Sequence, residues 1–228
     1  GNVALIAETI ESFFEVDADN NKVLKQYYTH NPIEKIKGAT KNYFGPSNEF
    51  ENISFGEYID ALEFFYDFVD TKDMQYLYLL MATFYRPKRN ILKRITSFKA
   101  DKRKPYNKEF VPVMAKKLKH QNIGVVYGFF MFFTSFQKYL TTAKIYVQGK
   151  ELDLSILYKD FPTTATFKSS IPGIGMKSIL YSISQSGIFG PLEKVRAAPF
   201  WEIIIRMYEI RKNDLDAYEQ HKNSQKNA

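Results

Sequence analysis

The chain has 228 residues, a formal net charge of +7, 45% hydrophobic residues and no cysteine. This length fits one large domain or two small ones and can bury a substantial core. The lack of cysteine excludes disulfides, thiol catalysis and cysteine-rich zinc sites. No basic region followed by an apolar run opens the chain, so we predict no signal peptide. The most apolar stretch, residues 123–133, is too short to span a bilayer.

The charge is divided unevenly along the chain. Residues 86–119 hold thirteen Lys or Arg and two acids, whereas residues 1–85 hold fourteen acids and six basic residues. Such segregation bears on partners and association more than on fold. Aromatic residues are also abundant, with 20 Phe and 16 Tyr. They predict a core built from rings, with rings exposed at a partner surface as the alternative.

In the first 50 residues, which could form a subdomain of their own, the pattern is helical. Apolar residues recur with the helical period over residues 3–16, and residues 17–21 break this helix before a second short one over residues 22–28. The Asp-rich break lacks the Gly and Glu of a calcium loop, so we predict no calcium site. A turn or short helix starts at Asn31-Pro32, and residues 38–50 are predicted to be a loop.

A capping box gives the clearest local signal. Ser54 precedes Glu57 by three residues, so its hydroxyl accepts the Glu57 N–H while the Glu57 carboxylate reaches back. We expect a helix from there to about Val69. Its apolar stripe comprises Ile59, Leu62, Phe65, Tyr66 and Val69, and its opposite side is an acidic docking face of Glu57, Asp60, Glu63 and Asp67. Thr71 is expected to cap the next helix, residues 74–85, which Pro87 ends.

No pattern of residues predicts catalysis. The acidic row could bind a cation or act as paired carboxylates, but its spacing is more typical of a solvated or docking face. His30, His120 and His221 do not pair at metal-ligand spacing. The glycines of residues 171–178 match neither the Walker pattern nor the dinucleotide fingerprint. We therefore predict a protein that is not an enzyme and uses no metal and no cofactor.

Residues 86–106 form a basic insert between two predicted helices. Its candidate partner- or anion-binding residues are Arg86, Lys88, Arg89, Lys93, Arg94, Lys102, Arg103 and Lys104. With interleaved aromatic residues, the segment 86–119 could contact phosphates and stack bases of nucleic acid. It could equally dock on an acidic protein surface. The acidic first part of the chain could also neutralise it, within one chain or between copies.

The distal part again has a helical pattern. Asn107 is expected to cap a helix through Lys119, with its lysines outward and its apolar residues inward, namely Phe110, Val111, Met114 and Leu118. The longest helix is predicted over residues 124–147, and a polar loop with a short extended segment follows. Further helices are expected over residues 172–186, ended by Gly187, and 200–210. Together these elements predict a mainly α, single compact domain, residues 1–210, with little or no β and a polar tail, residues 211–228.

Parts of this pattern resemble a protein family of tailed phages and prophages. The segment ISFGEYIDALEFFYD is followed by a helix ending in LLMATFYRPKR and then by KRKPYN. The resemblance is carried by residues 53–60 and 82–87. The later segments GVVYGFFMFF and IGMKSILYSISQSGIFGPLEKVRAAPFWEIIIRMYE are similar to the distal part of such proteins. In outline the likeness covers residues 53–209, and it is to tail assembly chaperones.

The resemblance implies a helical, non-enzymatic protein that shields long apolar helices of a tape-measure or tail protein during assembly. It implies a location in the cytoplasm of the bacterial host or in the virion, and a homo-oligomer is compatible with it. The alternative is a nucleic-acid-binding module that uses the basic segment 86–119.

Overall fold

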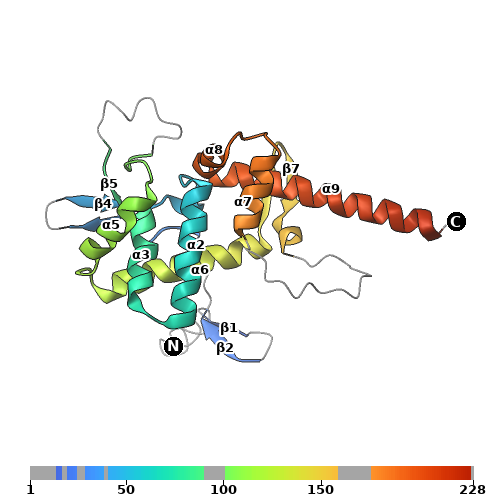
Figure 1. Ribbon diagram of the computed structural model, residues 1–228. Helices are drawn as coiled ribbons and strands as arrows, with labels where there is room; N and C mark the ends of the chain where they lie inside the picture. Colours follow the sequence, from blue (N-terminus) through green and yellow to red (C-terminus); the bar gives the residue numbers. More distant parts are fainter. Residues whose placement is uncertain are drawn as a thin grey trace.

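The computed structural model describes residues 14–16, 20–24, 29–38, 41–89, 101–158 and 176–226. Helices dominate these residues, which confirms the predicted mainly α class (Figure 1). The α-helices are α2 (Phe55–Thr71), α3 (Met74–Phe84), α5 (Val111–Leu118), α6 (Ile123–Thr142), α7 (Met176–Gln185), α8 (Leu192–Ala197) and α9 (Phe200–Lys226). Short 3-10 helices are η1 (Asn48–Phe50), η3 (Lys108–Phe110) and η4 (Leu154–Leu157).

The core lies where α2, α3 and α6 pack together. Helix α3 packs against α2, α5 and α6, and its mostly apolar sequence suits that central place. Phenylalanine rings fill the core, and the ring of Phe50 stacks on that of Phe132 with centroids 4.7 Å apart. The rings of Phe84, Phe129, Phe133 and Phe136 are also buried there. The prediction of a core built from rings is therefore confirmed.

The first described residues form strands, so the two helices predicted there are wrong at these positions. β1 (Phe14–Val16) pairs antiparallel with β2 (Lys22–Leu24). Between the strands Asn20 has a φ of 63°, a left-handed conformation that suits a turn and that Asn tolerates. The polar cluster that breaks the helical pattern therefore reverses the chain into a hairpin. The remainder of the predicted first helix, residues 3–13, lies outside the described residues.

Residues 38–50 are not only a loop, and the described residues contain three small sheets. β3 (Lys35–Lys37) pairs with β4 (Asn42–Phe44), and β4 pairs with β5 (Arg86–Pro87). Ile36 and Tyr43 face each other in this sheet and are buried. The sheet places the start of the basic insert against residues far earlier in the chain. Sequence pattern misses it because three-residue strands carry almost no alternation.

The distal part differs from the prediction at two helix ends. Helix α6 stops at Thr142, and β6 (Lys144–Val147) then pairs with β7 (Lys150–Asp153) across a turn in which Gln148 and Gly149 have positive φ. Helix α9, not α6, is the longest, because the predicted polar tail continues it to Lys226 (Figure 1). The left-handed end of α7 at Gly187 is confirmed by a φ of +71°.

Within the described ranges, no helix is both long and apolar enough to cross a membrane. The buried faces of α6 account for its apolar run: Val126, Phe129, Phe132 and Phe133 all point into the protein core.

Candidate functional site

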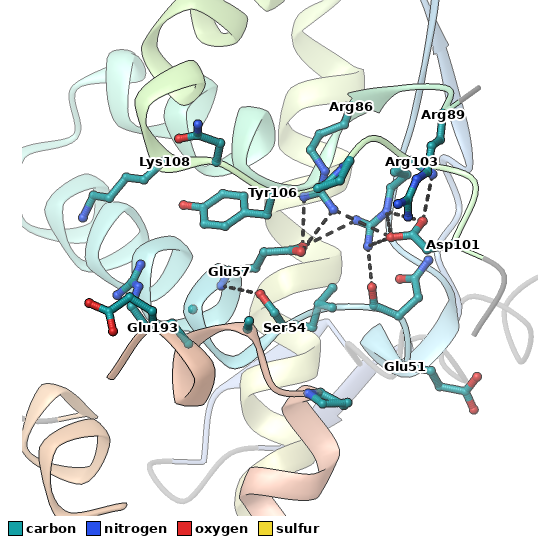
Figure 2. A pocket seen from close by; sticks show the side chains of 18 residues that line it. Glu51, Ser54, Glu57, Arg86, Arg89, Asp101, Arg103, Tyr106, Lys108 and Glu193 are labelled. Carbon is teal, nitrogen blue, oxygen red and sulfur yellow. Dashed lines mark hydrogen bonds and ion pairs between the residues drawn. The ribbon is translucent and has the colours of Figure 1, made fainter. Parts of the chain in front are cut away.

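Half of the predicted capping box is present at the start of α2. The Ser54 hydroxyl accepts a hydrogen bond from the Glu57 N–H at 3.2 Å. The Glu57 carboxylate does not complete the box as predicted, because it faces the Arg86 guanidinium instead, with N···O distances of 3.0 and 3.1 Å (Figure 2). An ion pair with a buried guanidinium is a stronger interaction for this carboxylate than a backbone N–H exposed at a helix end.

The basic insert begins and ends as two paired segments. The Arg89 N–H donates to the Lys102 carbonyl at 2.8 Å, and the Lys104 N–H donates to the Pro87 carbonyl at 2.9 Å. We call residues 86–89 and 101–104 the insert stem. The predicted binding residues Lys93 and Arg94 lie outside the described residues.

Two arginines of the stem are buried with their donors satisfied inside the protein. Arg86 donates to the Lys104 carbonyl at 2.7 Å and to the Thr83 carbonyl at 2.8 Å. Arg103 is 1% exposed and donates to the carbonyls of Phe84 and Asn52 and to the Asp101 carboxylate. Burial lowers the pKa of the Arg86 guanidinium, and the Glu57 carboxylate opposes that shift.

A second cluster surrounds Asp60, one turn further along α2. Its buried carboxylate accepts hydrogen bonds from the Tyr106 hydroxyl at 2.7 Å, from Lys108 Nζ at 2.9 Å and from the Arg196 guanidinium. Burial, followed by the adjacent Asp60 charge, raises the pKa of the Tyr106 hydroxyl. The Tyr106 ring also lies 5.7 Å from the Arg86 guanidinium carbon, which links the two clusters.

The predicted acidic docking face is therefore wrong for two of its four members. Glu57 and Asp60 are buried and paired with cations of the same chain. Glu63 Oε2 lies 3.6 Å from Lys108 Nζ, and Asp67 is half-buried on the outer part of α2. The acidic row thus neutralises the basic segment within one chain, one of the alternatives left open by the sequence.

The predicted basic site is divided in the same way. Arg86 and Arg103 are buried in the ion-pair cluster, Arg89 is half-buried, and Lys88, Lys102 and Lys104 are exposed. Within the stem, arginine serves the interior and lysine the surface. This fits their chemistry, since guanidinium satisfies several fixed acceptors at once and ammonium keeps its hydration.

A pocket of about 550 Å³ lies over these clusters (Figure 2). Its walls come from the start of α2, the insert stem, residues 105–108 and the connection from α8 to α9. Both signs of charge line it, the acidic side chains being Glu51, Glu57, Asp101 and Glu193 and the basic ones Arg86, Arg89, Arg103, Lys108 and Arg196. Since most of these groups bind one another, the pocket has little net charge with which to attract an ion.

His30, His120 and His221 are all exposed and come from separate parts of the chain. The described residues contain no group of three His, Cys, Asp or Glu that could hold a metal ion.

No protein-family model matches this chain, and the searches against curated proteins and solved structures also find no match. The argument for function therefore rests on the surface of the molecule.

A second candidate site is an exposed aromatic surface on α2 and α6. Tyr66 is 56% exposed, Tyr127 41% and Val69 38%. The half-buried rings of Phe65 and Phe130 lie between them, with centroids 5.6 Å apart. We call these five residues the α2–α6 aromatic face. Buried Phe68 supports it from below, since its ring contacts those of Phe130 and Tyr127.

Acidic residues dominate the rim of this face. Asp70 and Asp73 are exposed at the α2–α3 turn and Asp67 is half-buried, with Lys72 as the basic neighbour. The sequence prediction placed Tyr66 and Val69 in the inward stripe of α2, which is wrong. Aromatic residues occupy positions 64, 65, 66 and 68, so the apolar period leaves the inward direction ambiguous, and Phe68 takes the buried place.

A third exposed apolar surface lies on η3 and α5. Phe110 is 63% exposed, against the prediction that it faces inward, and Val113 is 50% exposed. Lys116 and Lys117 are exposed beside them, whereas Val111, Met114 and Leu118 are buried as predicted. Phe110 ends outside because the Asn107 cap, which accepts the Glu109 N–H at 2.9 Å, opens a short 3-10 turn that rotates it away from the inward side of α5.

Proposed function

We propose that this chain is a non-enzymatic assembly protein of a phage or prophage that acts by binding protein, with the α2–α6 aromatic face as its docking surface. The observation that carries the proposal is the exposure of Tyr66, Val69 and Tyr127 on one continuous ring-packed surface. Contiguous exposed apolar groups mark interaction sites, and aromatic residues are enriched at interface cores.

The chemistry of the face indicates the class of partner. An apolar centre favours the apolar side of a helix, and the acidic rim formed by Asp67, Asp70 and Asp73 favours basic flanks. The resemblance to tail assembly chaperones supplies a partner of that description, a long apolar helix of a tape-measure or tail protein. Binding would keep such a helix from aggregating before assembly.

The ion-pair clusters support a structural rather than a catalytic role for the buried carboxylates. Glu57 and Asp60 each bind cations of the same chain at hydrogen-bonding distance. A carboxylate held in this way is stabilised as the anion and is a poor general acid.

Nucleic-acid binding stays a prediction, and the geometry favours it less. Arg86 and Arg103 are committed to internal acceptors, which leaves Lys88, Lys102 and Lys104 exposed on the stem. Fluorescence anisotropy with labelled single- and double-stranded DNA and RNA at low salt tests it. Binding that falls steeply with salt and is lost when these three lysines are changed to alanine would replace the protein-binding proposal.

The proposal itself is tested by anisotropy with a labelled synthetic helical peptide that has a Leu- and Ala-rich centre and lysines at both ends. We expect the full chain to bind it and the Tyr66→Ser/Tyr127→Ser variant to bind about tenfold more weakly. The matched control is Tyr181→Ser, which removes a tyrosine 48% exposed on α7. Equal affinity for the double variant and the control would overturn the proposal.

A further inference from the structure

The exposed surface on η3 and α5 has the composition of a ligand for the α2–α6 aromatic face. Phe110, Val113 and Lys117 follow one another at spacings of three and four residues, and all three are exposed. With Lys116 they form what we call the α5 basic face. Residues three and four apart lie on one side of a helix, so this face presents two apolar side chains followed by lysines.

The two faces complement each other in charge. Around the α5 basic face, Lys116, Lys117 and Lys119 outnumber Glu109, and all four are exposed. Around the α2–α6 aromatic face, Asp67, Asp70 and Asp73 outnumber Lys72. Each surface has an apolar centre and a surplus of two charges of opposite sign, which favours docking of one on the other in a single orientation.

The two faces of one chain are kept apart by the fold. Helix α3 packs against both α2 and α5 and lies between them (Figure 1). Since the buried faces of all three helices belong to one core, α5 cannot move across to the outer side of α2 without unfolding. A contact between the two faces therefore requires two copies of the chain.

We propose that the α5 basic face of one copy docks on the α2–α6 aromatic face of a second copy, head to tail. The surfaces that meet are different, so the contact is heterologous and leads to a ring or an open chain of copies. The inference rests on the proposed function in one respect: self-association covers the docking surface, and a partner helix must displace the neighbouring copy. The acidic aromatic face then stays covered until its partner is present.

The association is weak because each face is small. Interfaces at the low end of the size range are transient, and a dissociation constant on the order of 10 µM is expected. The charged rims are exposed, so added salt weakens the contact.

Sedimentation velocity of the full chain over a range of concentrations tests the proposal. We expect the mean mass to rise with concentration for the wild type and for the control Tyr181→Ser. Lys117→Glu and Asp70→Lys should each weaken association about tenfold, because each places like charges opposite one another. A mixture of Lys117→Glu with Asp70→Lys should associate again, since both a wild-type pair of faces and a reversed charge pair are then available.

Two results overturn the inference. One is a wild type that stays monomeric at every concentration, and the other is a Lys117→Glu variant that associates as the wild type does. The outcome is separable from that of the proposed function. Lysine-flanked peptide that fails to bind while the charge-reversal pair still associates refutes the partner and keeps the self-contact. Peptide that binds a monomeric wild type as tightly as it binds Lys117→Glu keeps the partner and refutes the self-contact.

Discussion

Glu57 and Arg86 form an ion pair with N···O distances of 3.0 and 3.1 Å, although 29 residues separate them in the chain. Glu57 lies in the first turn of α2 and Arg86 is the first residue of the insert stem. Their side chains are 5% and 8% exposed, so water screens the pair little. The pair thereby fixes the insert to the end of α2 at which α8 and α9 also arrive.

We expect Glu57→Gln to destabilise the protein by about 3 kcal/mol, because removing one charge of a buried pair leaves the other uncompensated. Arg86 would lose its charged acceptor, and Arg103, whose guanidinium lies 3.7 Å from the same carboxylate, would lose part of its field. The measurement is urea-induced unfolding followed by circular dichroism. Asp70→Asn on the exposed end of α2 is the control and should change stability little. A Glu57→Gln variant as stable as this control would contradict the prediction.

The second prediction concerns Tyr106 at alkaline pH. Burial and the Asp60 carboxylate raise the pKa of its hydroxyl above the ordinary value of 10.0. The folded state therefore keeps a proton that the unfolded state releases, so stability is present below pH 10 and falls as pH rises above it. Tyr106→Phe should lose about 1 kcal/mol at pH 8, the contribution of its hydrogen bond to Asp60.

Above pH 10 the same variant should lose stability less steeply than the wild type, by about 1.4 kcal/mol per pH unit. Other buried tyrosines, including Tyr58 and Tyr85, also have raised pKa values, but they are common to both proteins and cancel in the difference. Urea unfolding of both proteins at several values between pH 8 and 11 measures the two slopes. Parallel curves would show that Tyr106 does not titrate differently in the two states.

The Ser54 cap and the direction of charge segregation were accessible from sequence, since both depend on residue type and local spacing. The use made of Glu57 was not. At the third position of a helix a glutamate can bond back to the cap or turn away, and the choice depends on an arginine that only the tertiary fold brings near. Asp60 is a similar case, because its partners Tyr106, Lys108 and Arg196 come from two distant segments.

The third prediction uses Gly56 in the first turn of α2. A Cβ at this position would lie 2.9 Å from the Arg196 carbonyl oxygen, a backbone atom that cannot rotate away. Gly→Ala inside a helix usually stabilises by about 0.5–1 kcal/mol, but here we expect a loss of about 1–3 kcal/mol from overpacking. Gly128→Ala on α6 is the matched control, since its Cβ would meet only the end of the Ile33 side chain. Urea unfolding should give opposite signs for the two variants.

The last prediction concerns how the C-terminal helices are held. Arg196 on α8 binds Asp60, and next to it the Phe200 N–H donates to the Ile53 carbonyl at 3.0 Å while the Phe55 N–H donates to the Ala198 carbonyl at 2.9 Å. In Arg196→Gln the backbone bridge loses its neighbouring ion pair, so the two amides should exchange hydrogen about fivefold faster, which corresponds to about 1 kcal/mol. Arg206→Gln is a fair comparison because the Arg206 side chain is 31% exposed, as against 30% for Arg196, and pairs only with Glu209 of its own helix. If the Phe55 and Phe200 amides exchange equally fast in both variants, the Asp60 ion pair does not hold this bridge closed, and the backbone hydrogen bonds and the buried Phe200 ring hold it alone.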